Sequence, residues 1–339
     1  MNKKKSTNTE LVNIEMDLKA RCDVSWVKEY DFSKLPQNFA ILMASQRRAG
    51  KTHLCKHLLY FVKNRFDHAY LFSKSAHMQV DAYDFIPKQN VYDTFDYEKI
   101  REIMMHQKRL REYNLKLPKD QQKDTNVLIM LDDVIADPSV RYGPGAAVIN
   151  ELFANGRHFL ISIVCLSQEL SSRGGFSTVV RKNCDVAIAF MIQDETTRQM
   201  FADAYLSIES KKAGKILLNS ITCDDDYTAI VADKSIPNIR GYKDYVFKAR
   251  APDNLKNFTI GIEDKKRKVF TDPEFNVYNI PSASGSFGGA KGPKTKNSLS
   301  PGMRAYAFQN KLKPGQIPGG FASGHRRCPQ KRLNLSLVS

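Results

Sequence analysis

The sequence has 339 residues with 42% hydrophobic side chains and a formal net charge of +16, which fits one large globular domain or two of ordinary size. The polar, basic residues Met1–Glu10 are followed by no apolar stretch, and the apolar run Phe159–Leu166 is far too short to cross a bilayer, so the sequence predicts neither a secretory signal nor a membrane span. The excess positive charge indicates a polyanionic partner, most commonly nucleic acid, with a solvated basic surface as the alternative.

The central part of the chain, residues 37–249, alternates short apolar runs with segments of helical periodicity. The apolar runs predict buried strands at 39–44, 69–72, 127–131, 159–166, 186–190 and 227–231. The periodic segments predict helices at 50–64, 97–115, 146–155, 179–182 and 195–205. Continuous apolar strands between amphipathic helices are typical of a parallel sheet covered on both faces, so we expect an α/β domain.

The segments that flank this domain differ from it in composition. We expect residues 1–36 to form an N-terminal extension, of which 10–36 pack on the core. Residues 250–339 are rich in Gly, Pro and Ser, and their last 64 residues carry ten Lys and Arg but no Asp or Glu. Such a segment is typical of a flexible, partly disordered basic tail. We expect it to bind DNA without sequence preference; docking to a protein partner, or a nuclear-type address, is the alternative.

A phosphate-binding pattern follows the first apolar run directly. Residues 45–52 match the Walker A pattern GxxxxGK[ST], except that Ser45 replaces the first glycine. In this pattern the loop amides and the helix N-terminus hold phosphates, Lys51 reaches the β- and γ-phosphates, and the Thr52 hydroxyl binds Mg²⁺. The predicted nucleotide-binding residues are Ser45, Gln46, Arg47, Arg48, Ala49, Gly50, Lys51, Thr52 and His53. One of Arg47 and Arg48 could contact the γ-phosphate; the alternative is that both are solvated side chains on an exposed loop.

Two later strand ends carry polar side chains suited to the same chemistry. The run 127–131 ends in Asp132 and Asp133, a Walker B pattern, and a buried parallel strand delivers its last residues to the edge where ligands bind. We expect Asp132 to hold Mg²⁺ and Asp133 to orient or deprotonate the attacking water. The next strand ends in Gln168, which we expect to sense the γ-phosphate or the water; a capping role is the alternative.

Two arginines occupy matching positions before strands. Arg157 lies in the turn before the run 159–166, and Arg181 precedes the run 186–190. Either arginine is a candidate finger that acts on the nucleotide of a neighbouring subunit, a role that can be worth roughly 10³–10⁵ in turnover. A structural or DNA-facing arginine is the alternative for each.

These motifs, taken together, resemble a family. The AGKT loop, the LIMLDD strand end, the NGRH turn, the SIVCLSQ strand and the VVRKNCD segment are similar to those of viral genome-packaging ATPases of the FtsK–HerA superfamily, of the poxvirus, large DNA virus and virophage type. The resemblance covers residues 37–235, with Ser45 and Asp133 as departures, since many members have Gly and Glu there. It implies a P-loop NTPase fold of RecA/FtsK type, with ATP and Mg²⁺ as cofactors.

The resemblance also implies a function. The expected protein is a homo-oligomeric ring that pumps double-stranded DNA into a preformed capsid, with capsid or portal vertex proteins as partners. It would act in the host cytoplasm at the viral factory or within the virion. Three other functions remain open: a helicase or conjugation-type motor of the same superfamily, an inactive DNA-binding structural protein, and a nucleoside kinase.

Overall fold

The computed structural model describes residues 21–78, 80–122, 125–168, 170, 176–223 and 226–261. The predictions for residues 1–20 and for the basic tail from residue 262 lie outside these ranges. Among the described residues, no helix is both long enough and apolar enough to cross a bilayer.

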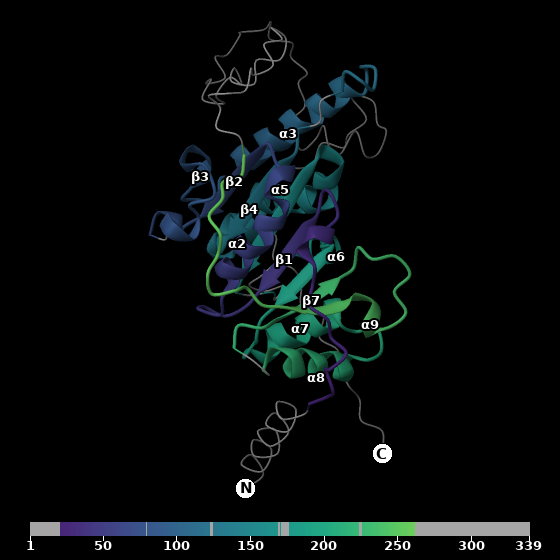
Figure 1. The fold of residues 1–339 in the computed structure, drawn as a ribbon. Helices are drawn as coiled ribbons and strands as arrows, with labels where there is room; N and C mark the ends of the chain where they lie inside the picture. The colour runs from purple at the N-terminus through teal and green to yellow at the C-terminus, as the bar shows by residue number, and fades with distance from the viewer. Residues whose placement is uncertain are drawn as a thin grey trace, which may run out of the picture. The chain divides into compact units, whose positions relative to one another are not determined.

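In the described part of the chain, eight strands form one sheet in the order β3-β2-β4-β5-β1-β6-β7-β8 (Figure 1). The strands are β1 Ala40–Ala44, β2 His68–Ser73, β3 Val91–Tyr92, β4 Val127–Asp132, β5 Ile161–Ser167, β6 Val186–Ala189, β7 Ala229–Asp233 and β8 Val246–Ala249. Neighbours from β3 to β6 pair in parallel, whereas β6 with β7 and β7 with β8 pair antiparallel. The predicted α/β fold is confirmed, and its sheet consists of mostly parallel strands.

One edge of the sheet departs from the all-parallel prediction. The last predicted strand, 227–231, is β7 at 229–233, and it runs opposite to β6. The two strands are connected through two successive helices, α7 (Glu195–Tyr205) and α8 (Lys211–Thr222), rather than through the single crossover helix that a parallel pair uses. β8 then continues as an antiparallel neighbour of β7.

The helices and short helical turns lie between these strands. The α-helices are α2 Lys51–Val62, α3 Tyr97–Asn114, α4 Pro138–Arg141, α5 Gly143–Asn155, α6 Thr178–Lys182, α7 Glu195–Tyr205, α8 Lys211–Thr222 and α9 Tyr242–Tyr245. The 3₁₀ turns are η1 Phe32–Lys34, η2 Lys63–Arg65, η3 Ala76–Met78, η4 Val80–Ala82, η5 Lys88–Asn90, η6 Val134–Ala136 and η7 Gly156–Phe159. The segment 211–222, which we did not predict as a helix, is α8.

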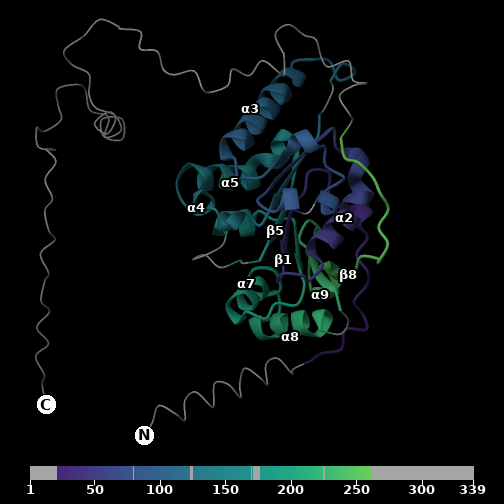
Figure 2. The same cartoon turned by 90° about the vertical axis from the view of Figure 1, so that its left-hand side faces the viewer.

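The helices divide unequally between the two faces of the sheet (Figure 2). Helices α3, α5, α6, α7 and α8 pack on one face, where Leu42 of β1 points. On the other face Ile41 and Met43 of β1 pack against α2. Because side chains alternate along a strand, the fully apolar β1 contributes side chains to the cores on both faces of the sheet, and all of its residues are buried.

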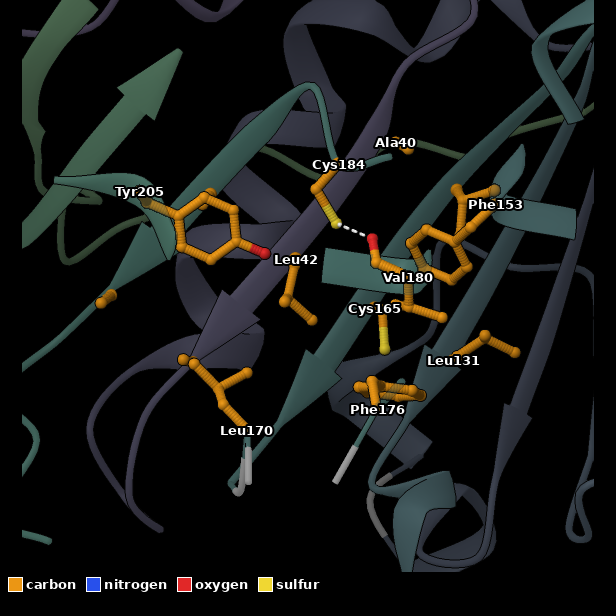
Figure 3. Packing of buried hydrophobic residues seen from close by; sticks show 14 of the residues in the cluster. Ala40, Leu42, Leu131, Phe153, Cys165, Leu170, Phe176, Val180, Cys184 and Tyr205 are labelled. Carbon is orange, nitrogen blue, oxygen red and sulfur yellow. Dashed lines mark hydrogen bonds between the residues drawn. The ribbon is translucent and has the colours of Figure 1, made fainter. Parts of the chain in front are cut away.

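The face with more helices contains two of the buried cysteines. Cys165 of β5 and Cys184, just before β6, lie among Phe176, Tyr205 and other apolar side chains, and the Cys184 Sγ donates to the carbonyl of Val180 (Figure 3). Burial raises the pKa of the Cys184 thiol to about 12. Both thiols are free, and a raised pKa makes them unreactive, so they serve as core residues.

Two peripheral segments complete the face that carries α2. Residues 29 and 30 pair with β8, where the Tyr30 amide donates to the Lys248 carbonyl over 2.8 Å, and Phe32 and Leu35 are buried. Residues 250–261, here called the strap, run alongside α2 (Figures 1 and 2). Apolar side chains within residues 27–35 therefore pack on the core, while the division of the chain into an N-terminal extension and a domain stays a prediction.

The strap is held to the domain along its length. The His53 Nε2 of α2 lies 2.8 Å from the carbonyl oxygen of Pro252. The ring of Phe258 stacks on that of Phe85 with 5.1 Å between centroids, and the Ile260 amide donates to the Phe85 carbonyl over 2.8 Å. The first twelve residues of the predicted C-terminal region therefore pack on the domain.

Candidate nucleotide-binding site

The predicted phosphate-binding loop leaves the sheet at the end of β1, between β5 and β6, and enters α2. Gly50 is the N-cap of α2, with φ of 92°, a left-handed conformation that glycine adopts without steric cost. Arg48 also has a positive φ of 62°, whereas Ser45 does not. The backbone at position 45 therefore does not require glycine, and the Ser45 amide instead donates to the Ser167 carbonyl over 3.1 Å.

A cavity of about 630 Å³ lies over this loop, within the range of roughly 300–1,000 Å³ usual for small-ligand sites. Its walls contain most of the predicted site residues, namely Gln46, Arg47, Arg48, Ala49, Gly50, Lys51, Thr52, His53, Asp132, Asp133 and Gln168. Ser75 and Tyr227 also line it. Ser45, which is only 2% exposed, lies beneath the loop and does not line the cavity.

Asp132 is the last residue of β4 and is 4% exposed. Its Oδ2 accepts a hydrogen bond from the Tyr83 hydroxyl at 2.5 Å and another from the Ser73 Oγ at 3.1 Å. Ser73 is the register partner of Asp132 in β2, so the sheet itself brings these two residues together. Burial raises the pKa of the Asp132 carboxyl, and the Tyr83 hydrogen bond opposes that shift.

Thr52 completes this cluster. Burial raises the pKa of the Tyr83 phenol, with Asp132 as the next cause, and a hydrogen bond with the Thr52 side chain opposes the rise. The Thr52 side chain and the Asp132 carboxylate thus both lie beside the Tyr83 phenol. Both are hard oxygen ligands, and Mg²⁺ prefers one or two such protein ligands together with phosphate and water oxygens. The residues fit the predicted metal site.

Asp133 lies beside Asp132 in a left-handed conformation with φ of 49°. Its Oδ2 accepts a 2.6 Å hydrogen bond from the Gln168 Nε2, and its Oδ1 lies 3.5 Å from the Lys51 Nζ. The Lys51 side chain is 9% exposed, so this ammonium is placed inside the cavity rather than in bulk water. The structure therefore brings Lys51, Asp133 and Gln168 into one hydrogen-bonded group.

Sequence reasoning missed Ser73, Ser75, Tyr83 and Tyr227. Ser73 follows the predicted strand 69–72 directly and Ser75 comes two residues later, so the rule that identified Asp132 and Gln168, a polar residue at or just after a strand end, also applies to them. Tyr83 lies between η4 and β3, in a segment without strand or helix periodicity, and no sequence signal identifies it.

The two candidate arginine fingers lie outside the cavity. Arg157 is exposed and lines a separate cavity of about 160 Å³ with Ala40, Ile161 and Asp185, at the starts of β1, β5 and β6. Arg181 donates to the carbonyls of Leu170 and Phe176, at 3.1 and 2.5 Å. Neither arginine serves the cavity of its own chain, and their action on a neighbouring subunit stays a prediction.

Several known proteins are similar to this chain. The uncharacterized protein 088R of Invertebrate iridescent virus 3 is 26% identical over 215 residues, which are 62% of this chain and 75% of that protein. The genome packaging NTPase B204 from Sulfolobus turreted icosahedral virus 2, solved with AMPPCP, aligns with a TM-score of 0.40 and 14% identity over 64% of this chain and 100% of that one. The pCW3 conjugation coupling protein TcpA aligns with a TM-score of 0.44 and 13% identity over 69% of each chain.

The family comparison matches a long continuous part of the sequence. The model described as Poxvirus A32 protein matches residues 27–238, which contain the phosphate-binding loop and both carboxylates. Because this match spans more than half of the chain, the chain belongs to the Poxvirus A32 protein family, which confirms the poxvirus-type P-loop ATPase predicted from the sequence.

Proposed function

We propose that this chain is an ATP-driven translocase that packages a viral genome, as double-stranded DNA, into a capsid. The observation that carries the proposal is the group formed by Lys51, Asp133 and Gln168 beside the phosphate-binding loop. A lysine for the terminal phosphates and a carboxylate held by a second side chain are the parts that hydrolysis requires. Membership of a poxvirus protein family supports the viral role.

Each residue has a task that follows from its place. The amides at the N-terminus of α2 and the Lys51 ammonium bind the phosphates. Mg²⁺ held by Thr52 and Asp132 would neutralise charge on the phosphate oxygens. Asp133 orients the attacking water and accepts its proton, a task for a carboxylate beside the phosphate site. Gln168 fixes the Asp133 carboxylate by donating to Oδ2, so that Oδ1 faces the Lys51 side.

This role for Gln168 modifies the prediction from sequence. We predicted that its amide senses the γ-phosphate or the water directly. The 2.6 Å hydrogen bond to Asp133 supports an indirect role, in which the amide positions the carboxylate that contacts the water. An amide is suited to both tasks, because its NH₂ donates while its carbonyl oxygen accepts.

The DNA, the ring and the partners belong to the same proposal. A net charge of +16, with ten basic residues in the last 64 positions, suits a polyanionic substrate. In a ring of identical subunits, the exposed Arg157 of one subunit would act on the nucleotide of the next. Capsid or portal vertex proteins would anchor the ring, and the work would take place in the host cytoplasm or the virion.

Translocation is tested by the displacement of a third DNA strand from a duplex. A pump that moves along a duplex removes the bound third strand and leaves the duplex paired. The expected result is ATP-dependent release of the third strand, stimulation of ATP hydrolysis by duplex DNA, and no strand separation. The Lys51→Ala protein serves as the inactive control. Strand separation would indicate a helicase, and hydrolysis unaffected by DNA would contradict a motor.

A further inference from the structure

A second cavity adjoins the one over the phosphate-binding loop, and Asp133 does not line it. It has a volume of about 270 Å³, and Gly50, His53 and Tyr227 line both this cavity and the one over the phosphate-binding loop. The remaining walls come from Phe190 and from Arg250 and Asp253 of the strap, together with two apolar neighbours. The two cavities therefore share one boundary, formed by the first turn of α2 and by Tyr227.

Two aromatic rings form the side of the second cavity next to the loop. A Cβ placed on Gly50 would lie 3.3 Å from the Tyr227 Cδ1 and 3.6 Å from the Phe190 Cε1, so both rings pack against the Gly50 backbone. Phe190 is 2% exposed, whereas Tyr227 is 59% exposed. Tyr227 also has a positive φ of 63°, which is uncommon for a bulky residue. A large aromatic surface is thus held open to solvent beside the loop.

The strap supplies the polar part of the second cavity. The hydrogen-bonding distance of 2.8 Å between the His53 Nε2 and the Pro252 carbonyl fixes the strap against the start of α2. Arg250 and Asp253 lie on either side of Pro252 in the sequence and bring a guanidinium and a carboxylate to the cavity wall. An aromatic surface with a few hydrogen-bonding groups at its edge is the usual composition of a site for a planar heterocycle.

We infer that the second cavity binds the purine base of the nucleoside triphosphate, with Tyr227 as its stacking surface. The inference rests on the proposed function of the phosphate-binding loop. Phosphates held by the Gly50–Thr52 amides leave the sugar and base to extend away from Asp133 and Gln168, toward the boundary formed by His53 and Tyr227. A purine offers a larger π-surface than a pyrimidine, so stacking on Tyr227 favours purines.

The test measures the equilibrium binding of ADP, of a non-hydrolysable ATP analogue and of inorganic tripolyphosphate to the full chain. The variants are Tyr227→Ala, which removes the ring, and Tyr227→Phe, which keeps it. Since base–aromatic stacking is worth ~1–3 kcal/mol per base, Tyr227→Ala should weaken ADP and the ATP analogue roughly 5- to 150-fold. Tripolyphosphate, which has no base, should bind the variant as well as it binds the wild type.

The purine preference gives a second readout. Wild-type protein and Tyr227→Phe should bind purine triphosphates more tightly than pyrimidine triphosphates, and Tyr227→Ala should lose most of that difference. Unchanged ADP affinity in Tyr227→Ala would overturn the inference, and so would an equal loss for ADP and tripolyphosphate, because that result indicates a distorted loop. Wild-type protein that binds ATP in this way but does not hydrolyse it would instead refute the proposed function and leave the base site standing.

Discussion

The Tyr83 hydroxyl donates a 2.5 Å hydrogen bond to the Asp132 carboxylate across 49 positions of sequence. Tyr83 is 3% exposed, and the second donor to Asp132, Ser73, reaches the same oxygen, Oδ2. Two donors on one oxygen fix the carboxylate and orient Oδ1 as the remaining oxygen for a metal. Partners that orient a metal ligand in this way usually change metal affinity or activity by roughly 10- to 100-fold when they are removed.

Tyr83→Phe should therefore weaken the response to magnesium. Loss of the phenol hydroxyl removes a donor that opposes the raised pKa of Asp132, so the carboxyl becomes less available as a charged ligand. We expect the Mg²⁺ concentration for half-maximal ATP hydrolysis to rise roughly 10- to 100-fold. Steady-state phosphate release over a range of Mg²⁺ concentrations measures it.

A second tyrosine–aspartate hydrogen bond, away from the nucleotide cavity, provides a matched control. The Tyr30 hydroxyl donates to the buried Asp233 carboxylate over 2.7 Å, and neither residue lines the nucleotide cavity. Tyr30→Phe should lower stability without any change in the Mg²⁺ requirement. If both variants shift the Mg²⁺ requirement equally, the effect is one of general stability, and the proposed role of Tyr83 is wrong.

Arg157 should act across a subunit interface. Arg157 is exposed and lies away from the nucleotide cavity of its own chain, so any catalytic effect would be on the nucleotide of a neighbouring subunit. As an arginine finger acting there, its replacement in Arg157→Ala should reduce hydrolysis by roughly 10³-fold or more. Mixtures of inactive Arg157→Ala and inactive Lys51→Ala subunits should recover part of the activity, since some interfaces then pair an intact lysine with an intact arginine. Phosphate release that stays at background at every mixing ratio would exclude this role for Arg157.

Arg181 should contribute mainly to stability. Its guanidinium donates to the carbonyls of Leu170 and Phe176, two residues that follow Gln168 in the sequence. Arg181→Ala leaves those carbonyls without their donor and should lower the free energy of unfolding by about 1–3 kcal/mol. Arg157→Ala, at an exposed position, should change it by less than about 0.5 kcal/mol. Denaturant unfolding of both variants measures the difference, and equal stability would contradict this assignment.

The basic tail should supply salt-dependent affinity for DNA. A truncation after residue 275 removes ten Lys and Arg and keeps the strap. If about five of these charges contact phosphates, the slope of log affinity against log salt should shrink by roughly 4–5. Basal ATP hydrolysis should be unchanged, because the proposed catalytic residues precede residue 182. Equal slopes for the full and truncated chains in duplex DNA titrations would favour docking of the tail to a protein.

The sequence predicted those strands and helices whose apolar residues follow one clear pattern along the whole element. The largely apolar runs around Leu42, Met130 and Val164 became β1, β4 and β5, because burial on both faces favours apolar side chains along the whole strand, with Ser162 as a small buried exception inside β5. The direction of β7 was not predictable in this way, since parallel and antiparallel buried strands have the same apolar pattern. β8 was missed because it is four residues long and half of its side chains are only partly buried.

The site was predictable where the chemistry is local in sequence. Lys51 and Thr52 belong to one short pattern, and Asp132, Asp133 and Gln168 end strands that meet at one edge of the sheet. Tyr83 and the strap reach the site through tertiary packing on α2, and no short pattern records such contacts. Ser45 departs from the Walker A pattern in sequence only. Its φ is not positive, so the backbone at this position does not need the glycine that the pattern has there.

The central claim is that Lys51 and Asp133 act on ATP at different steps. The most direct measurement combines the binding of a fluorescent ATP analogue with phosphate release for Lys51→Ala and Asp133→Asn. Lys51→Ala should bind the nucleotide weakly and release no phosphate. Asp133→Asn should bind like the wild type and release phosphate at least about 10²-fold more slowly, the usual loss when a general base is removed. Wild-type turnover by Asp133→Asn would contradict the account.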